Sequence, residues 1–108
     1  MPGKLDLKGD PEELIKLFAK YANNVAATTH GWDGSKLVFI SDVWKSFQRT
    51  PLTSHLTRAQ FDDLLLIAMR QGLVRLERAD LVAAMDSEKV RKSEIKYLNA
   101  TFHFVLRR

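Results

Sequence analysis

The stretch LVFISDVWKSFQRTPLTSHLTRAQFDDLLLIAMRQGLVRLER, residues 37–78, carries the signals that decide the fold. Its first four residues, 37–40, are apolar and too few for a helix, so they predict a short strand. Ser41 stands where the N-cap of a helix belongs, and Pro51 would close that helix soon after Arg49. The first part of the stretch therefore predicts a strand followed by a helix over residues 42–49.

The second part of the stretch predicts a helix and then another strand. Thr57 followed three residues later by Gln60 is the signature of a capping box, and Gly72 is a typical C-terminal stop after a helix that runs through Gln71. Apolar and charged residues then alternate over 73–78, as in a half-buried strand. The adjacent pair at residues 66–67 widens the apolar stripe of the helix, and we expect this pair to be buried.

Outward from this stretch, both flanks show regular patterns. Asp10 and Pro11 predict a helix start, and apolar residues at three- and four-residue spacing continue the helix to about Ala27. Residues 100–107 alternate with Phe102 and Phe104 on one face, which predicts a strand that pairs antiparallel with residues 73–78. Residues 80–99 between the two strands are too apolar for a plain loop and predict one or two short helices.

Length and composition favour one domain over residues 1–108, with residues 1–9 as a flexible N-terminal segment. The absence of cysteine excludes thiol catalysis and cysteine-ligated metal sites. The longest apolar run, residues 64–69, is far shorter than the roughly 20 residues needed to cross a bilayer, so we expect no membrane segment and an intracellular location. The net charge of +4 mildly favours a polyanionic partner.

No recognised catalytic motif is present in the sequence. Glycine-rich phosphate loops, nucleophile elbows and zinc-protease helices are all missing. His30, His55 and His103 are too scattered for a standard metal site. We therefore expect a binding protein and not an enzyme, with no metal and no cofactor.

The predicted order of elements, helix, short strand, helix, helix, strand and strand, resembles the winged-helix variant of the helix-turn-helix family. The resemblance is clearest over residues 37–78, and it implies an α+β fold. Such a fold has three N-terminal helices with a short strand, followed by a two-stranded antiparallel wing, which here carries a helical insert. The resemblance also implies binding to double-stranded DNA in transcription regulation, with a homodimer in which the first helix is the natural dimer element.

By this resemblance, the third helix is the recognition helix, and its first turn faces the base edges in the major groove. Thr57, Arg58 and Gln60 are then the base contacts, with arginine suited to guanine and glutamine to adenine. Basic side chains of the second helix and of the wing would contact phosphates. These candidates are Lys45, Arg49, Arg78, Lys89, Arg91, Lys92 and Lys96.

A second interpretation of the sequence gives the chain a protein partner in place of DNA. Asp62 and Asp63 lie near the start of the third helix and would oppose phosphate binding if they faced DNA. The wide apolar face of this helix also favours contact with a protein. The sequence therefore keeps open a protein–protein interaction module, or a subunit of a larger complex, with the same fold.

Overall fold

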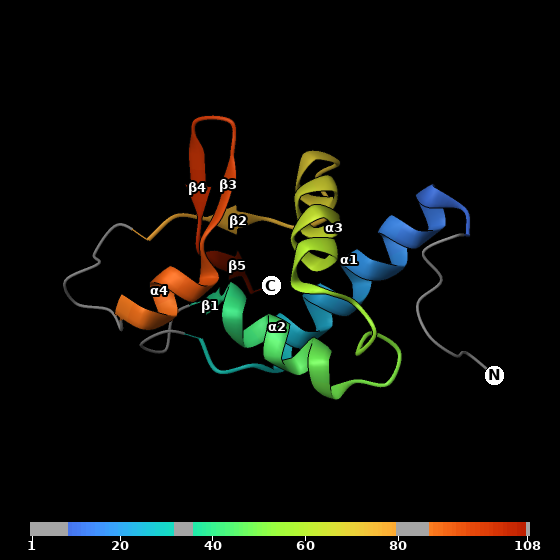
Figure 1. Cartoon of the computed structure of the whole chain (residues 1–108), viewed down its shortest axis with the longest axis horizontal. Helices are drawn as coiled ribbons and strands as arrows, with labels where there is room; N and C mark the ends of the chain where they lie inside the picture. The colour runs from blue at the N-terminus through green and yellow to red at the C-terminus, as the bar shows by residue number, and fades with distance from the viewer. Residues whose placement is uncertain (1–8, 32–35, 80–86, 108) are drawn as a thin grey trace.

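The computed structural model describes residues 9–31, 36–79 and 87–107, which form a mixed α+β arrangement (Figure 1). The expectations for segment 1–9 and for residues 80–86 lie outside the described residues, apart from Gly9. In chain order, the elements are α1 (Pro11–Thr28), β1 (Leu37–Phe39), α2 (Ile40–Arg49), α3 (Arg58–Arg70), β2 (Leu76–Glu77), α4 (Ser87–Ser93), β3 (Ile95–Tyr97), β4 (Ala100–Phe102) and β5 (Phe104–Leu106).

The ends of α1 and α3 follow the predicted capping signals. The Asp10 side chain accepts a hydrogen bond from the backbone N–H of Glu12 at 3.0 Å, and Pro11 is the first helical residue of α1. The predicted capping box at the start of α3 is present. Gly72, after the end of α3, has a φ of +74°, in the left-handed region that glycine adopts most readily. Both helices are therefore confirmed to within one residue at each end.

The start of α2 differs from the prediction. The helix begins at Ile40, and Ser41 lies buried inside its first turn and does not act as the N-cap. The backbone N–H of Ile40 donates to the carbonyl of His103 at 3.0 Å, and that of Ser41 donates to Ser93 Oγ at 2.9 Å. Because distant residues satisfy these two amides, the helix starts without a local side-chain cap.

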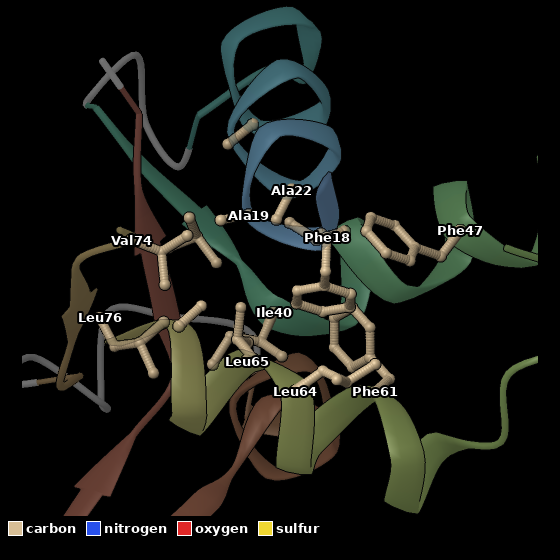
Figure 2. Packing of buried hydrophobic residues seen from close by; sticks show 14 of the residues in the cluster. Phe18, Ala19, Ala22, Ile40, Phe47, Phe61, Leu64, Leu65, Val74 and Leu76 are labelled. Atoms are coloured by element: carbon tan, nitrogen blue, oxygen red, sulfur yellow. The ribbon is translucent and has the colours of Figure 1, made fainter. Parts of the chain in front are cut away.

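The main core lies where the first three helices meet (Figure 2). Phe18 from α1 packs edge to face against Phe47 of α2 and Phe61 of α3, with ring centroids 5.4 and 5.8 Å apart. The rings of Phe47 and Phe61 are themselves 5.1 Å apart, and Trp44 lies 5.2 Å from Phe61. This aromatic cluster joins three helices that are separated in the sequence.

A three-stranded antiparallel sheet, in the order β1-β5-β2, covers one side of this core. The predicted pairing between the two wing strands is confirmed, since Leu76 is opposite Val105. The sheet nevertheless has three strands and not the two expected, because β1 also pairs with β5. Side chains alternate across this sheet: Val105 belongs to the main core, whereas Phe104 packs with Phe39 in a second cluster that includes a residue of α4.

Residues 100–107 form two strands and not the single strand predicted. The break is at His103, whose backbone N–H donates to the carbonyl of Glu77 and whose carbonyl accepts from Ile40. Phe102 therefore packs against the main core and Phe104 against the second cluster, and the prediction that they share a face is wrong.

The segment before the break is also only partly helical. α4 confirms one short helix within residues 80–99, but β3 and β4 form an antiparallel hairpin, with Tyr97 opposite Ala100. The hairpin and the C-terminal half of α3 extend from the same side of the molecule (Figure 1).

Candidate macromolecule-binding surface

The polar side chains predicted to contact bases take part in local interactions at the start of α3. Thr57 Oγ1 accepts from the backbone N–H of Gln60 at 3.1 Å, and Gln60 Oε1 accepts from the backbone N–H of Thr57 at 2.9 Å. These two bonds satisfy amides that an α-helix leaves unpaired at its N-terminus. A base contact by either side chain would compete with the cap of the helix.

Arg58 forms an ion pair on its own helix. Its Nε donates to Asp62 Oδ1 at 2.7 Å, and its guanidinium carbon lies 6.0 Å from the centre of the Phe61 ring. Partial burial raises the pKa of the Asp62 carboxyl; the hydrogen bond and charge of Arg58 oppose this rise, and the charge of Asp63 adds to it. The charge that the resemblance assigns to guanine recognition is therefore largely compensated within the chain.

The phosphate-contact candidates fall into two groups. The lysines of the insert are paired: Lys89 Nζ lies 3.4 Å from Asp42, Lys92 Nζ lies 3.2 Å from Glu88, and Lys96 Nζ lies 3.6 Å from Glu94. Within the described part of the chain, no carboxylate lies within 4.0 Å of the side-chain nitrogens of the other four. These are Lys45, Arg49, Arg78 and Arg91.

The seven candidate phosphate contacts do not form one cluster at the end of a single helix. Lys89 of α4 is paired with Asp42 in the first turn of α2, whereas Arg49 is the last residue of α2. Asp42 and Arg49 are seven positions apart on the helix, a rise of about 10 Å. The basic residues are therefore spread over α2, α4, β3 and the segment after β2, and three of them are paired with carboxylates.

The exposed side of α3 is not basic but combines apolar residues with charges of both signs. Ala59, Asp63, Ile67 and Arg70 recur at four- and three-residue spacing and form one exposed stripe. Leu66, beside the stripe, is half-buried against the core, but Ile67 is 36% exposed, so the expected burial of Ile67 is wrong. This stripe contains one acidic and one basic residue around an apolar centre.

The tip of the β3–β4 hairpin lies beside the C-terminal end of this stripe. The guanidinium carbon of Arg70 is 5.8 Å from the centre of the Tyr97 ring. The next residue, Leu98, is 86% exposed and has a φ of +54°. Leucine is costly in this left-handed conformation and also costly in water, so both properties of Leu98 call for an explanation.

We call the residues of the stripe and of the hairpin tip the α3–hairpin surface; they are Ala59, Asp63, Ile67, Arg70, Tyr97 and Leu98. Sequence reasoning identified the apolar excess at Ile67 but missed the hairpin. The turn sequence Leu98-Asn99 has no glycine or proline, which are the usual signals of a tight turn.

A polar junction holds the insert against the rest of the fold. The backbone N–H of Ala79 donates to His103 Nδ1 at 3.1 Å, and His103 Nε2 lies 3.9 Å from Glu94 Oε2. Burial lowers the pKa of His103, with the Glu94 carboxylate opposing this shift and Arg78 adding to it. Because Nδ1 accepts a hydrogen bond from a backbone N–H, this histidine supports the structure in its neutral form.

Among residues 9–31, 36–79 and 87–107, no three metal-ligating side chains are grouped in a way that could hold a metal ion. No helix in the described ranges has the length and apolar character needed to cross a bilayer. Comparison of the chain with protein-family models, with curated proteins and with solved structures gives no match.

Proposed function

We propose that this chain is a winged-helix module. The supporting observations are the element order over α1, β1, α2, α3 and β2, and the position of β5 between β1 and β2 in the sheet. In this interpretation the hairpin β3–β4 and α4 form an insert between the two strands of the wing. The proposed arrangement makes α3 the element that a winged-helix protein presents to its partner.

We infer that the module binds another protein through the α3–hairpin surface and that its role is recognition and not catalysis. The observation that carries this inference is Leu98, an 86% exposed leucine at φ +54° that follows Tyr97, the residue whose ring lies 5.8 Å from the Arg70 guanidinium carbon of α3. Water surrounds this apolar side chain in the free protein. Its insertion into an apolar pocket of a partner would remove apolar surface from water, which is favourable.

The charge of the surface favours a protein over DNA. Asp63 and Arg70 cancel each other in formal charge, and Arg58 at the start of α3 is compensated by Asp62. A helix that enters the major groove is surrounded by phosphates, which favour an excess of positive charge. Mixed charge around an apolar centre is what protein interfaces commonly show.

Site-specific photo-crosslinking in cells that produce the protein tests this function. A photo-reactive amino acid would replace Leu98 in one variant, Ile67 in a second and Lys20 of α1 in a control. We expect polypeptide adducts from the first two positions and few from the control position. Equal labelling at all three positions, or adducts to nucleic acid alone, would overturn the inference.

DNA binding is the second candidate, and one observation favours it. Lys45, Arg49, Arg78 and Arg91 have no carboxylate within ion-pair distance among the described residues, so their charges remain available to phosphates. Binding to a fluorescent random duplex should then weaken steeply as salt rises. The pair of substitutions Lys45→Ala and Arg49→Ala should reduce the salt slope by about two if both side chains contact phosphates. No binding at low salt would remove this candidate.

A further inference from the structure

We propose that the protein partner of the α3–hairpin surface is a second copy of this chain. This inference rests on the proposed protein-binding function and identifies its partner. In the proposed dimer, the two α3 helices lie antiparallel and a two-fold axis passes between Leu66 and Ile67. The first helix, which the sequence suggests as the dimer element, is then not the contact.

The charges of the exposed stripe are self-complementary about this axis. Asp63 lies three and a half residues before the midpoint between Leu66 and Ile67, and Arg70 lies three and a half residues after it. With a rise of 1.5 Å per residue, each charge is about 5 Å from the axis along the helix. An antiparallel copy therefore places Asp63 opposite the partner's Arg70 and Arg70 opposite the partner's Asp63, as a two-fold interface requires.

The centre of the same stripe is apolar. Ile67 is 36% exposed, and Leu66 beside it is half-buried, so each helix offers an apolar contact where the axis passes. The antiparallel arrangement places Ile67 opposite the partner's Leu66 on both sides of the axis. Burial of these side chains is the main source of affinity, and the two charge pairs fix the register.

The hairpin contributes to the orientation of this surface. Tyr97 lies 5.8 Å from the guanidinium carbon of Arg70, a cation–π distance that holds the charge beside β3. Leu98 follows Tyr97 in the turn between β3 and β4 and is 86% exposed. A copy bound along α3 would therefore meet a positioned arginine and an apolar hairpin tip.

The surface is small, so the dimer should be weak. Stable complexes bury about 800 Å² on each partner, and a single helix stripe with a hairpin tip offers less. We expect dissociation constants from micromolar to about 1 mM. Sedimentation velocity from about 10 µM to about 1 mM covers this range.

Charge reversal provides the decisive test. Asp63→Arg and Arg70→Asp should each raise the dissociation constant at least about tenfold, because each substitution creates two like-charge contacts across the axis. An equimolar mixture of the two single variants should form a heterodimer, and the double variant should recover the homodimer. Lys20→Asp, an exposed reversal on α1, should leave association unchanged. Circular dichroism confirms that every variant is folded.

The outcomes separate this proposal from the proposed function. A wild-type chain that stays monomeric to about 1 mM, or a dimer that both single reversals leave intact, overturns self-association. If position 98 still crosslinks to other polypeptides in that case, the protein-binding function stands with a different partner. Monomeric protein without such crosslinks overturns both.

Discussion

Leu98 combines an unfavourable backbone conformation with a side chain that is 86% exposed. Its φ of +54° is a conformation that asparagine adopts at much lower cost than leucine. We predict that Leu98→Asn raises the free energy of unfolding by about 1 kcal/mol, because the strain at this position is relieved. Urea unfolding measures this gain, and crosslinking or sedimentation measures the accompanying loss of association.

Leu17 provides the matched control for that prediction. It is 40% exposed but lies in the regular helix α1, so no backbone strain is relieved there. Leu17→Asn should lower the free energy of unfolding by about 0.5 kcal/mol, since asparagine is the poorer helix former. A loss of stability in both variants would show that the conformation of Leu98 is not strained.

His103 makes stability depend on pH. Burial lowers its pKa below the usual 6.5, so the unfolded chain binds a proton more readily than the folded one as pH falls below 6.5. Protonation also places a hydrogen on Nδ1, which accepts the backbone N–H of Ala79. We therefore predict that the contribution of His103 to stability is complete above pH 6.5 and is lost as pH falls from there toward 5.

The variant His103→Asn isolates this effect. Its Oδ1 can accept the same backbone hydrogen bond but does not titrate in this range. The fall in the free energy of unfolding between pH 7 and pH 5 should be smaller in this variant than in the wild type. His30→Asn, at an exposed histidine, is the matched control substitution. Identical profiles for His103→Asn and the wild type would contradict the prediction.

At the scale of elements, α2 depends on α4 for its start. Ser93 is fully buried, and its Oγ accepts the backbone N–H of Ser41 at 2.9 Å. We predict that Ser93→Ala lowers the free energy of unfolding by about 1–3 kcal/mol, because it leaves a buried amide without a partner. Thermal or urea unfolding measures this loss. Ser54→Ala, at an exposed serine, should change stability by less than about 0.5 kcal/mol.

The elements that the sequence predicted correctly are those with local signals. Asp10 and the Thr57–Gln60 pair cap their helices through neighbouring amides, so the pattern and the structure agree. The start of α2 could not be predicted, because Ser93 and His103 supply its hydrogen bonds from more than 50 residues away. The hairpin was missed for a similar reason, since its turn lacks a glycine signal and packing determines its position.

The candidate site was predicted only in part, because the sequence does not show which charged side chains form ion pairs in the folded chain. The sequence analysis identified Arg58, Lys89 and Lys92 as cations, but it did not pair them with Asp62, Asp42 and Glu88, their partners in the folded chain. One of these pairs, between Lys89 and Asp42, joins two helices that are distant in sequence. Base and phosphate contacts by these residues stay predictions.

At the scale of the whole molecule, Phe18 couples the three helices of the main core. It is fully buried and lies within 5.8 Å of the rings of Phe47 and Phe61. Phe18→Ala should lower the free energy of unfolding by about 3–5 kcal/mol, a large fraction of the 5–15 kcal/mol typical of a domain. Urea unfolding followed by circular dichroism and by tryptophan fluorescence should show one coincident transition.

Exposed Lys16, two residues earlier on α1, is the matched position for this measurement. Lys16→Ala should change the free energy of unfolding by no more than about 0.5 kcal/mol. A comparable loss in both variants, or a Phe18→Ala loss below about 1 kcal/mol, would mean that the aromatic cluster does not couple the helices.

The order of the sheet has a consequence for synthesis on the ribosome. β5 is the middle strand, but it follows β1 and β2 along the chain, so both outer strands are translated before the strand that joins them. A nascent chain halted before Phe104 exposes two strand edges together, a state open to pairing with other chains. Only pairing with residues 104–106 covers the inner edges of β1 and β2, so chaperones and proteases that bind exposed strand edges meet more such edges in an interrupted chain than in one that carries β5.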